Sequence, residues 1–434
     1  MMRYLMILLL CAPLCAQEAL PWREGQPGYH NATLELARFC LEHNLVSECR
    51  LLVRRAEKAL PEPAAALVKQ CEDKTDSYTA ANWGAYLDKR EAVQWRRAAG
   101  AHAAGTEPQW VLHIDPEHAP SHETLGRRWL EGVGWLDGTE HERLAPLVLR
   151  EFAFKPEREA IWEKPWVLLG KHFTLVTDLT WERALKYSGL LDQFHAAYFD
   201  KLGDVIPRRK QPNVVWCCKS AATFVKVSAQ MGFPMPATNA GLHVGALSTV
   251  IINAERSDEV GRKNKARDNL ARTMFHECAH RLTEIGLRGR NPSAWELSRT
   301  TEHAWIVESI AVVFEDLHFE KGAPVLRGLE DQRKYTIEKH WKGKTGKVPA
   351  LMPVLGQGQA DFASDQPISN AEKYALAGSV AWFCLFENAG KHRAAYLGLL
   401  VDYYRADTRG RDFEARFGLK AAEFESEWRV WVVK

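Results

Sequence analysis

Residues 273–282 read TMFHECAHRL, which contains the pattern H-E-x-x-H. Apolar side chains recur at helical spacing from 269 to 285 and a glycine follows, so we predict a helix here. Positions i and i+4 lie on one face of a helix, so the imidazoles of His276 and His280 can reach one metal ion together. Glu277 lies beside them, where its carboxylate can act as a general base on a water molecule.

A second predicted helix carries one acid among apolar residues. Residues 305–314 read WIVESIAVVF, with Glu308 as the acid. Burying this carboxylate is costly unless a counter-charge compensates it, and a zinc ion would do so. Glu308 follows His280 by 28 residues (308 − 280), enough for a loop between two helices. We therefore predict that His276, His280 and Glu308 bind one Zn²⁺ and leave a coordination position for water.

This H-E-x-x-H followed by E-x-x-A resembles the gluzincin metallopeptidases, in which the acid of a later helix is the third zinc ligand. The order of elements is also similar to that of gluzincin-like (peptidase MA-like) domains of secreted bacterial proteins, with predicted strands at 172–177, 213–216 and 250–253. The resemblance covers roughly the last two thirds of the chain and implies a zincin-like α+β domain, a small sheet plus active-site helices. Thermolysin-type enzymes carry an aspartate four residues after the third ligand, where Val312 stands here. The outer partner of His276 must therefore come from elsewhere.

Amide hydrolysis also needs a hydrogen-bond donor for the oxyanion. Related gluzincin-like domains have a tyrosine in a helix after the third ligand, and the resemblance makes Tyr374 the candidate here. The alternative is a tyrosine that packs its ring in the core and leaves its hydroxyl in water. Glu302 or His303 becomes the candidate ligand if Glu308 points away from the two histidines, and His303 could otherwise lie at the rim of the site.

Other histidines have weaker patterns. His195 lies on the core face of a helix predicted to end near 202, and we expect a satisfied core or boundary residue there. His243 and His318 have no supporting pattern. The predicted strand at 250–253 could form a sheet edge to which an extended peptide substrate adds as a further strand.

Composition indicates an ordinary globular protein of about two domains. The 434 residues carry 57 basic and 55 acidic side chains, so charge gives no reason to expect nucleic acid or an anionic membrane as a partner. Residues 1–16 have one cation, a short apolar run and Ala16 before Gln17, which is typical of a cleaved signal peptide. We expect an exported protein, in the periplasm, at the cell surface or outside the cell, with no stable membrane span after cleavage. An uncleaved anchor or a lipoprotein is the alternative.

The region 17–150 is predicted to be an all-α module. Its stretch 111–119, VLHIDPEHA, is similar to the junction between tetratricopeptide repeats, which makes the region a degenerate helical-repeat module. Such a module could pack on the enzyme or bind a protein partner. Prolines at 156 and 165 mark a linker, so the expected order is signal peptide 1–16, helical module 17–150 and gluzincin-like metallopeptidase domain 151–434.

Seven cysteines remain after cleavage, and an odd number leaves at least one free thiol. Cys40 and Cys49 could form a bridge across a helical hairpin, or could simply pack as small buried residues.

The sequence thus predicts an exported zinc-dependent peptidase with Glu277 as general base. The alternatives are an exported binding or scaffold protein with a vestigial or structural zinc site, and a zinc hydrolase that cleaves another kind of bond. An intact Glu277 argues against a structural site, because such a site has no use for a base.

Overall fold

The computed structural model describes residues 28–152, 156–247, 249–264, 268–289, 304–326, 328–329, 331–341, 348–358, 361–362, 364–365, 368–405 and 413–432. Residues 1–16, the expected signal peptide, and the candidates Glu302 and His303 lie outside these ranges. The chain divides into two compact units: the first comprises the residues up to Arg128 with Val225–Met235, and the second comprises Trp129–Phe224 and the residues from Pro236 onward.

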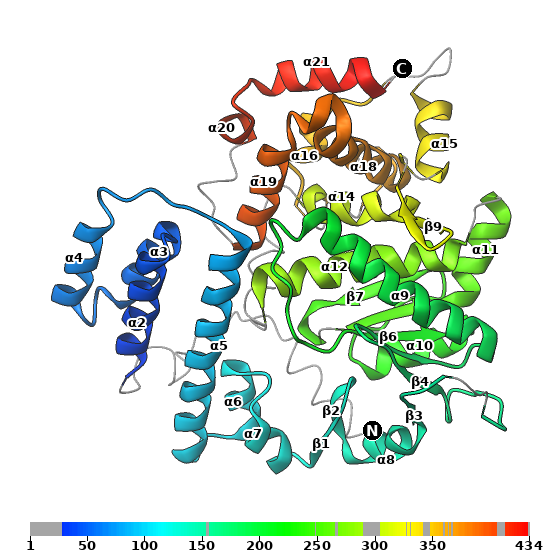
Figure 1. Ribbon diagram of the computed structural model, residues 1–434, viewed down its shortest axis with the longest axis horizontal. Helices are drawn as coiled ribbons and strands as arrows, with labels where there is room; N and C mark the ends of the chain where they lie inside the picture. Colours follow the sequence, from blue (N-terminus) through cyan, green and yellow to red (C-terminus); the bar gives the residue numbers. More distant parts are fainter. Residues whose placement is uncertain are drawn as a thin grey trace. The chain divides into compact units, whose positions relative to one another are not determined.

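The first unit is built mainly from helices (Figure 1). These are α2 (Tyr29–Glu42), α3 (Val46–Ala56), α4 (Pro61–Gln70), α5 (Ala80–Ala103), α6 (Pro108–Ile114) and α7 (Ala119–Thr124). Helices α2 and α3 pack together across a tight turn at Asn44, whose φ of 57° is tolerated by asparagine better than by most residues. Helix α5 is capped by Thr79, whose side chain accepts a hydrogen bond from the backbone of Asn82 in a capping box.

The expectation that 17–150 is entirely helical is wrong. Strands β1 (Arg127–Leu130) and β2 (Gly134–Asp137) form a two-stranded sheet, and β3 (Val148–Leu149) pairs with a strand of the second unit. The chain turns between β1 and β2 at Gly132 and Gly134, whose φ values are 76° and 109°. Glycine reaches such values without strain, so these two residues specify a turn. The sequence had been interpreted as helical here.

The second unit has a mixed α+β architecture with a six-stranded sheet. Its other strands are β4 (Trp166–Leu169), β5 (Thr174–Thr177), β6 (Val214–Cys218), β7 (Gly241–Val244) and β8 (Thr249–Asn253), in the order β3-β4-β5-β6-β8-β7. Strands β5, β6 and β8 run parallel and every residue in them is buried, as expected for a sheet covered on both faces.

The expected sheet edge at 250–253 is wrong, because β8 is paired on both sides. Its neighbours are β6 and the antiparallel strand β7. The four-residue β7 was not recognised in the sequence, and it ends the described sheet.

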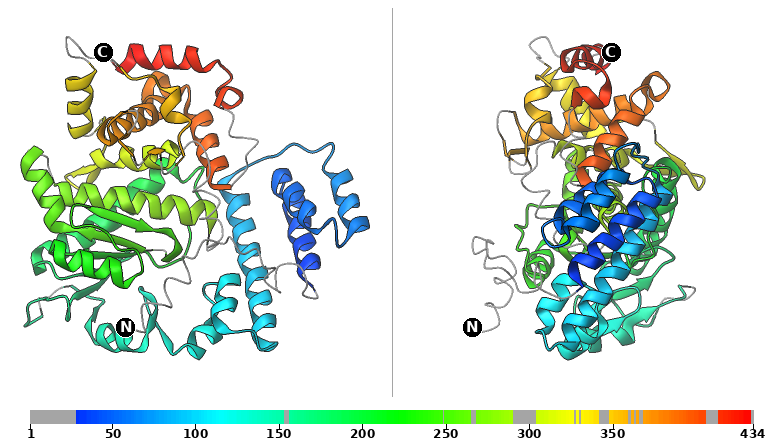
Figure 2. Two further views of the ribbon diagram at one scale, coloured as in Figure 1. Left: turned by 180° about the vertical axis from the view of Figure 1, so that it is seen from behind. Right: turned by 90° about the vertical axis from the view of Figure 1, so that its left-hand side faces the viewer.

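The second unit also contains helices before, between and after the strands of this sheet. They are α8 (Gly138–Leu144), α9 (Trp181–Leu202), α11 (Ala254–Asn264), α12 (Asn269–Arg288), α14 (Trp305–Val313), α15 (Asp331–His340), α16 (Met352–Leu355), α18 (Asn370–Phe386), α19 (Arg393–Arg405), α20 (Phe413–Phe417) and α21 (Ala421–Val432). Helix α10 (Ala221–Gln230) has residues in both units, and β9 (His318–Glu320) and β10 (Ala323–Val325) form a short antiparallel pair in the second unit. Helix α12 packs on β7 and β8, α14 packs on α12, and α18 packs on α14 (Figure 2).

Helices α14 and α18 approach each other closely at a glycine. A Cβ atom on Gly378 would come within 2.3 Å of Cγ1 of Val312, so only glycine allows this approach. Glu308 precedes Val312 by one helical turn and Tyr374 precedes Gly378 by one turn. The contact therefore fixes the two helices next to the candidate site. No helix in the described ranges combines the length and hydropathy that a bilayer crossing requires.

Candidate metal centre

Helix α12 carries the H-E-x-x-H residues. It begins after Asp268, whose side chain accepts a hydrogen bond from the backbone N–H of Ala271 at 3.0 Å. Its apolar face is buried through Leu270, Met274, Cys278 and Leu282. His276 and His280 project from another face of the helix, as their spacing of four residues requires.

The three expected ligands come together. The Nε2 atoms of His276 and His280 lie 3.1 Å apart, and each lies 3.4 Å from Oε2 of Glu308. One ligand atom from each residue falls within a group no wider than 4.8 Å. Glu308 therefore points toward the histidines rather than away from them.

The polar atoms of this cluster fit a metal ion. Oε2 of Glu308 is buried and has no hydrogen-bond donor among the described residues. A buried carboxylate oxygen without a donor is costly, and two imidazoles that face the same point do not remove that cost unless protonated. Two histidine nitrogens and one carboxylate oxygen are the ligand set of many catalytic zinc sites, which keep a fourth position open.

Glu315 contacts His276 at Nδ1, the ring nitrogen that does not face Glu308. It lies in the short 3₁₀ helix Phe314–Asp316 that follows α14, and its Oε1 lies 2.9 Å from Nδ1 of His276. Arg333 donates to both oxygens of Glu315, at 2.8 and 3.0 Å, and Arg272 donates to Oε2 at 3.2 Å. The sequence analysis did not identify Glu315 as a partner of His276. The one signal was an acid immediately after an apolar helix, seven positions beyond Glu308.

Electrostatics within the cluster favours a positively charged His276 beside a negatively charged Glu308. Burial lowers the pKa of His276, but the neighbouring carboxylates of Glu308 and Glu315 outweigh this effect and raise the pKa to about 10. Burial raises the pKa of Glu308, yet the two histidines bring it well below its ordinary value. Both changes keep opposite charges next to each other, so a bound cation would replace a proton on His276.

Glu277 lies between the ligands and the sheet edge. A Cβ on Gly241 of β7 would come within 2.8 Å of Cγ and 3.0 Å of Oε1 of Glu277, so the strand backbone approaches this side chain closely. Burial raises the pKa of Glu277, although His276 and His280 oppose the increase. A carboxylate with a raised pKa is a stronger base, which suits proton transfer at neutral pH.

Tyr374 also reaches the cluster. Its ring centroid lies 6.1 Å from that of His276, and the guanidinium of Arg333 lies 5.0 Å from it. Burial, together with the carboxylates of Glu308 and Glu277, holds the pKa of Tyr374 well above its ordinary value. The hydroxyl therefore stays protonated and can donate a hydrogen bond.

Of the other histidines considered in the sequence, one lies beside the cluster and two lie elsewhere. His243, which had no supporting pattern, lies on β7 with its ring 6.2 Å from that of His280 and nearly parallel to it. Gly241 and His243 share one face of β7, and this face lies along α12. His195 is stacked on His172 at 3.8 Å, away from the cluster, and His318 contacts the backbone oxygen of Asp316.

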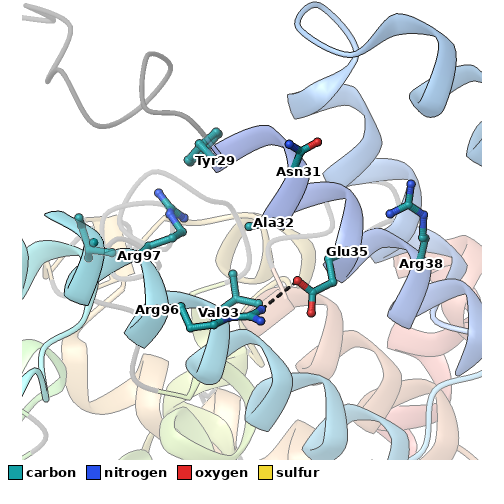
Figure 3. A pocket seen from close by; sticks show the side chains of 11 residues that line it. Tyr29, Asn31, Ala32, Glu35, Arg38, Val93, Arg96 and Arg97 are labelled. Atoms are coloured by element: carbon teal, nitrogen blue, oxygen red, sulfur yellow. Dashed lines mark hydrogen bonds and ion pairs between the residues drawn. The ribbon is translucent and has the colours of Figure 1, made fainter.

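A cavity of about 500 Å³ lies in the first unit and shares no residue with the metal cluster (Figure 3). It is lined by residues of α2 and α5, among them Arg38, Arg96 and Arg97. Glu35 forms an ion pair with Arg96 at 2.9 Å, and the guanidinium of Arg97 lies 4.3 Å from the ring centroid of Tyr29.

Comparison with known proteins adds no family: no protein-family model matches the chain, and no curated protein matches it.

Proposed function

We propose that this protein is an exported zinc-dependent peptidase of the gluzincin type. The observation that carries the proposal is the convergence of His276, His280 and Glu308 on one point, with an oxygen of Glu308 buried and without a hydrogen-bond donor. Glu277 and Tyr374 border the same point. A binding site alone would need the three ligands but neither of these two groups.

Each side chain has a distinct part in the proposed reaction. A zinc ion held by His276, His280 and Glu308 would supply Lewis acidity for a water molecule and a peptide carbonyl. Glu277 accepts a proton from the attacking water and returns it to the leaving nitrogen, which its raised pKa favours. Tyr374 donates a hydrogen bond from its protonated hydroxyl to the developing oxyanion.

Strand β7 supports a peptide as the substrate. It ends the described sheet, and its residue Gly241 lies against Glu277. An extended chain that pairs with such an edge uses backbone hydrogen bonds, which every peptide offers. We therefore propose that a peptide substrate adds as a further strand to β7 (Gly241–Val244), in place of the segment 250–253 expected from the sequence.

Substitution of Glu277 tests the proposal. Glu277→Gln keeps the shape of the side chain but cannot accept a proton, so we expect full zinc content with cleavage reduced about a hundredfold to ten-thousandfold. Zinc content and cleavage of a peptide library are measured on the same purified samples. Glu182→Gln is the matched control, because Glu182 is an exposed residue at the start of α9, and it should behave as the wild type.

Two outcomes would redirect the interpretation. Near-normal cleavage by zinc-loaded Glu277→Gln would exclude Glu277 as the base. Stoichiometric zinc without cleavage of any peptide by the wild type would favour the alternative of an exported binding or scaffold protein, or a hydrolase that cleaves another kind of bond.

One feature of the first unit favours a partner on the helical module. The cavity between α2 and α5 has three arginines on its lining and one acid, Glu35, which is paired with Arg96. An acidic peptide segment of a protein partner is the complementary chemistry. Arg97→Glu should then abolish co-purification of such a partner and leave peptidase activity unchanged.

A further inference from the structure

Two buried thiols of the first unit face each other. Cys49 lies in α3 and Cys71 follows the last residue of α4, and the Sγ atoms are 3.4 Å apart. Neither residue has any exposed surface. The sequence had raised Cys40 as the partner of Cys49, whereas the sulfur that faces Cys49 belongs to Cys71.

Several hydrogen bonds hold the two segments in this register independently of the sulfur atoms. Arg50, next to Cys49, donates to the backbone oxygen of Cys71 at 2.7 Å. Further along, the N–H of Ser47 donates to Asp76 at 3.0 Å, and the N–H of Ser77 donates to the oxygen of Asn44 at 2.8 Å. A bond between the sulfurs therefore needs only their own approach, from 3.4 Å to about 2.05 Å.

We propose that Cys49 and Cys71 form a structural disulfide in the mature protein. The two thiols lose two protons and two electrons as the Sγ–Sγ bond forms, and a disulfide-bearing oxidant takes up both and becomes two thiols. The bond ties α3 to the end of α4 across a loop of 22 residues (71 − 49). Export to an oxidising compartment supplies the oxidant, and the bond does not depend on the metal centre.

The bond should form during folding rather than afterwards. Burial and the neighbouring Cys71 raise the pKa of the Cys49 thiol to about 12. The reactive thiolate is therefore scarce in the folded protein, and solvent cannot reach either sulfur. The finished bond is protected from small reductants by the same burial.

Peptide mapping of the full chain tests this assignment. Denatured, reduced protein is refolded with a mixture of reduced and oxidised glutathione, free thiols are blocked, and the protein is digested with trypsin. We expect peptide 39–50 linked to peptide 70–74. Because 39–50 contains both Cys40 and Cys49, a second cleavage after Glu42 identifies the bonded residue.

Matched variants separate a real bond from a failure to fold. Cys40→Ser, a buried cysteine on the adjacent helix, should retain the linked peptides and a melting temperature that falls by roughly 5–10 °C on reduction. Cys71→Ser should lose both. The proposal is overturned if 49 and 71 are recovered as blocked free thiols or as glutathione adducts in wild-type protein with a folded circular dichroism spectrum, or if Cys49 is bonded to Cys40.

Discussion

Nδ1 of His276 lies 2.9 Å from Oε1 of Glu315, and this carboxylate is itself held by two arginines. The pair fixes the orientation of the imidazole and directs Nε2 toward Glu308. Val312, four residues after the proposed ligand Glu308, is apolar and packs on Gly378. A 3₁₀ turn after α14 delivers the acid from position 315 instead.

Glu315→Gln should therefore weaken zinc binding. The amide leaves a buried neutral group beside Arg272 and Arg333 and no longer stabilises the ligand's orientation, so the dissociation constant for zinc should rise about 10–100-fold. Competition with a chromogenic chelator measures this change. Asp316→Asn, the adjacent acid in the same turn, is the control and should keep the wild-type affinity; equal affinities for all three proteins would remove Glu315 from the centre.

Tyr374→Phe should slow cleavage without releasing zinc. The variant loses only the hydroxyl that we propose as the oxyanion donor, and one such donor typically contributes about a hundredfold to a thousandfold in kcat. Steady-state kinetics should show a fall in kcat with little change in KM. Tyr335→Phe, which removes the hydroxyl of an exposed tyrosine in α15, should leave kcat unchanged. A wild-type kcat for Tyr374→Phe would mean that the ring serves packing alone.

Gly241→Ala should misplace Glu277, the proposed general base. The added Cβ would meet Cγ of Glu277 at 2.8 Å and Cγ2 of Thr273 at 3.0 Å, so the Glu277 side chain has to move. We expect cleavage reduced about a hundredfold with zinc content intact. Gly189→Ala is the control, since its Cβ would meet no atom within 4 Å, and its activity should match that of the wild type. Full activity of Gly241→Ala would show that the strand does not limit the carboxylate.

Stability should fall on acidification through His195. Burial lowers the pKa of His195 from 6.5 to about 4. The unfolded chain therefore binds more protons than the folded one between these values, and the free energy of unfolding decreases as pH falls from about 6.5 to about 4. Thermal denaturation of His195→Phe should show a smaller decrease across this window than the wild type. Identical pH profiles for both proteins would mean that His195 titrates normally in the fold.

Local patterns in the sequence predicted the parts of the site that local structure determines. The predicted strands at 172–177, 213–216 and 250–253 correspond to β5, β6 and β8, and the helix at 305–314 corresponds to α14. Helical periodicity sufficed to place His276 and His280 on one face. The isolated acid in an apolar helix indicated Glu308 as the residue that joins them.

What the sequence did not reveal depends on contacts between distant segments. Glu315 becomes the partner of His276 only because a 3₁₀ turn redirects the chain after α14. His243 lies beside His280 because β7 pairs with β8, and four residues are too few to show strand alternation. The β1–β2 turn was missed because two glycines, rather than any apolar pattern, determine it.

The contact between Gly378 and Val312 bears on when Tyr374, the proposed oxyanion donor, becomes ordered. A tyrosine on a loop would lose backbone freedom each time substrate bound, at a cost of about 1–2 kcal/mol for every residue ordered. Tyr374 stands instead on a helix that packs on α14 through this glycine, so its backbone entropy is lost once, when the chain folds. The free energy gained when the proposed substrate binds is then not needed to order this backbone, and it can lower the barrier of the reaction.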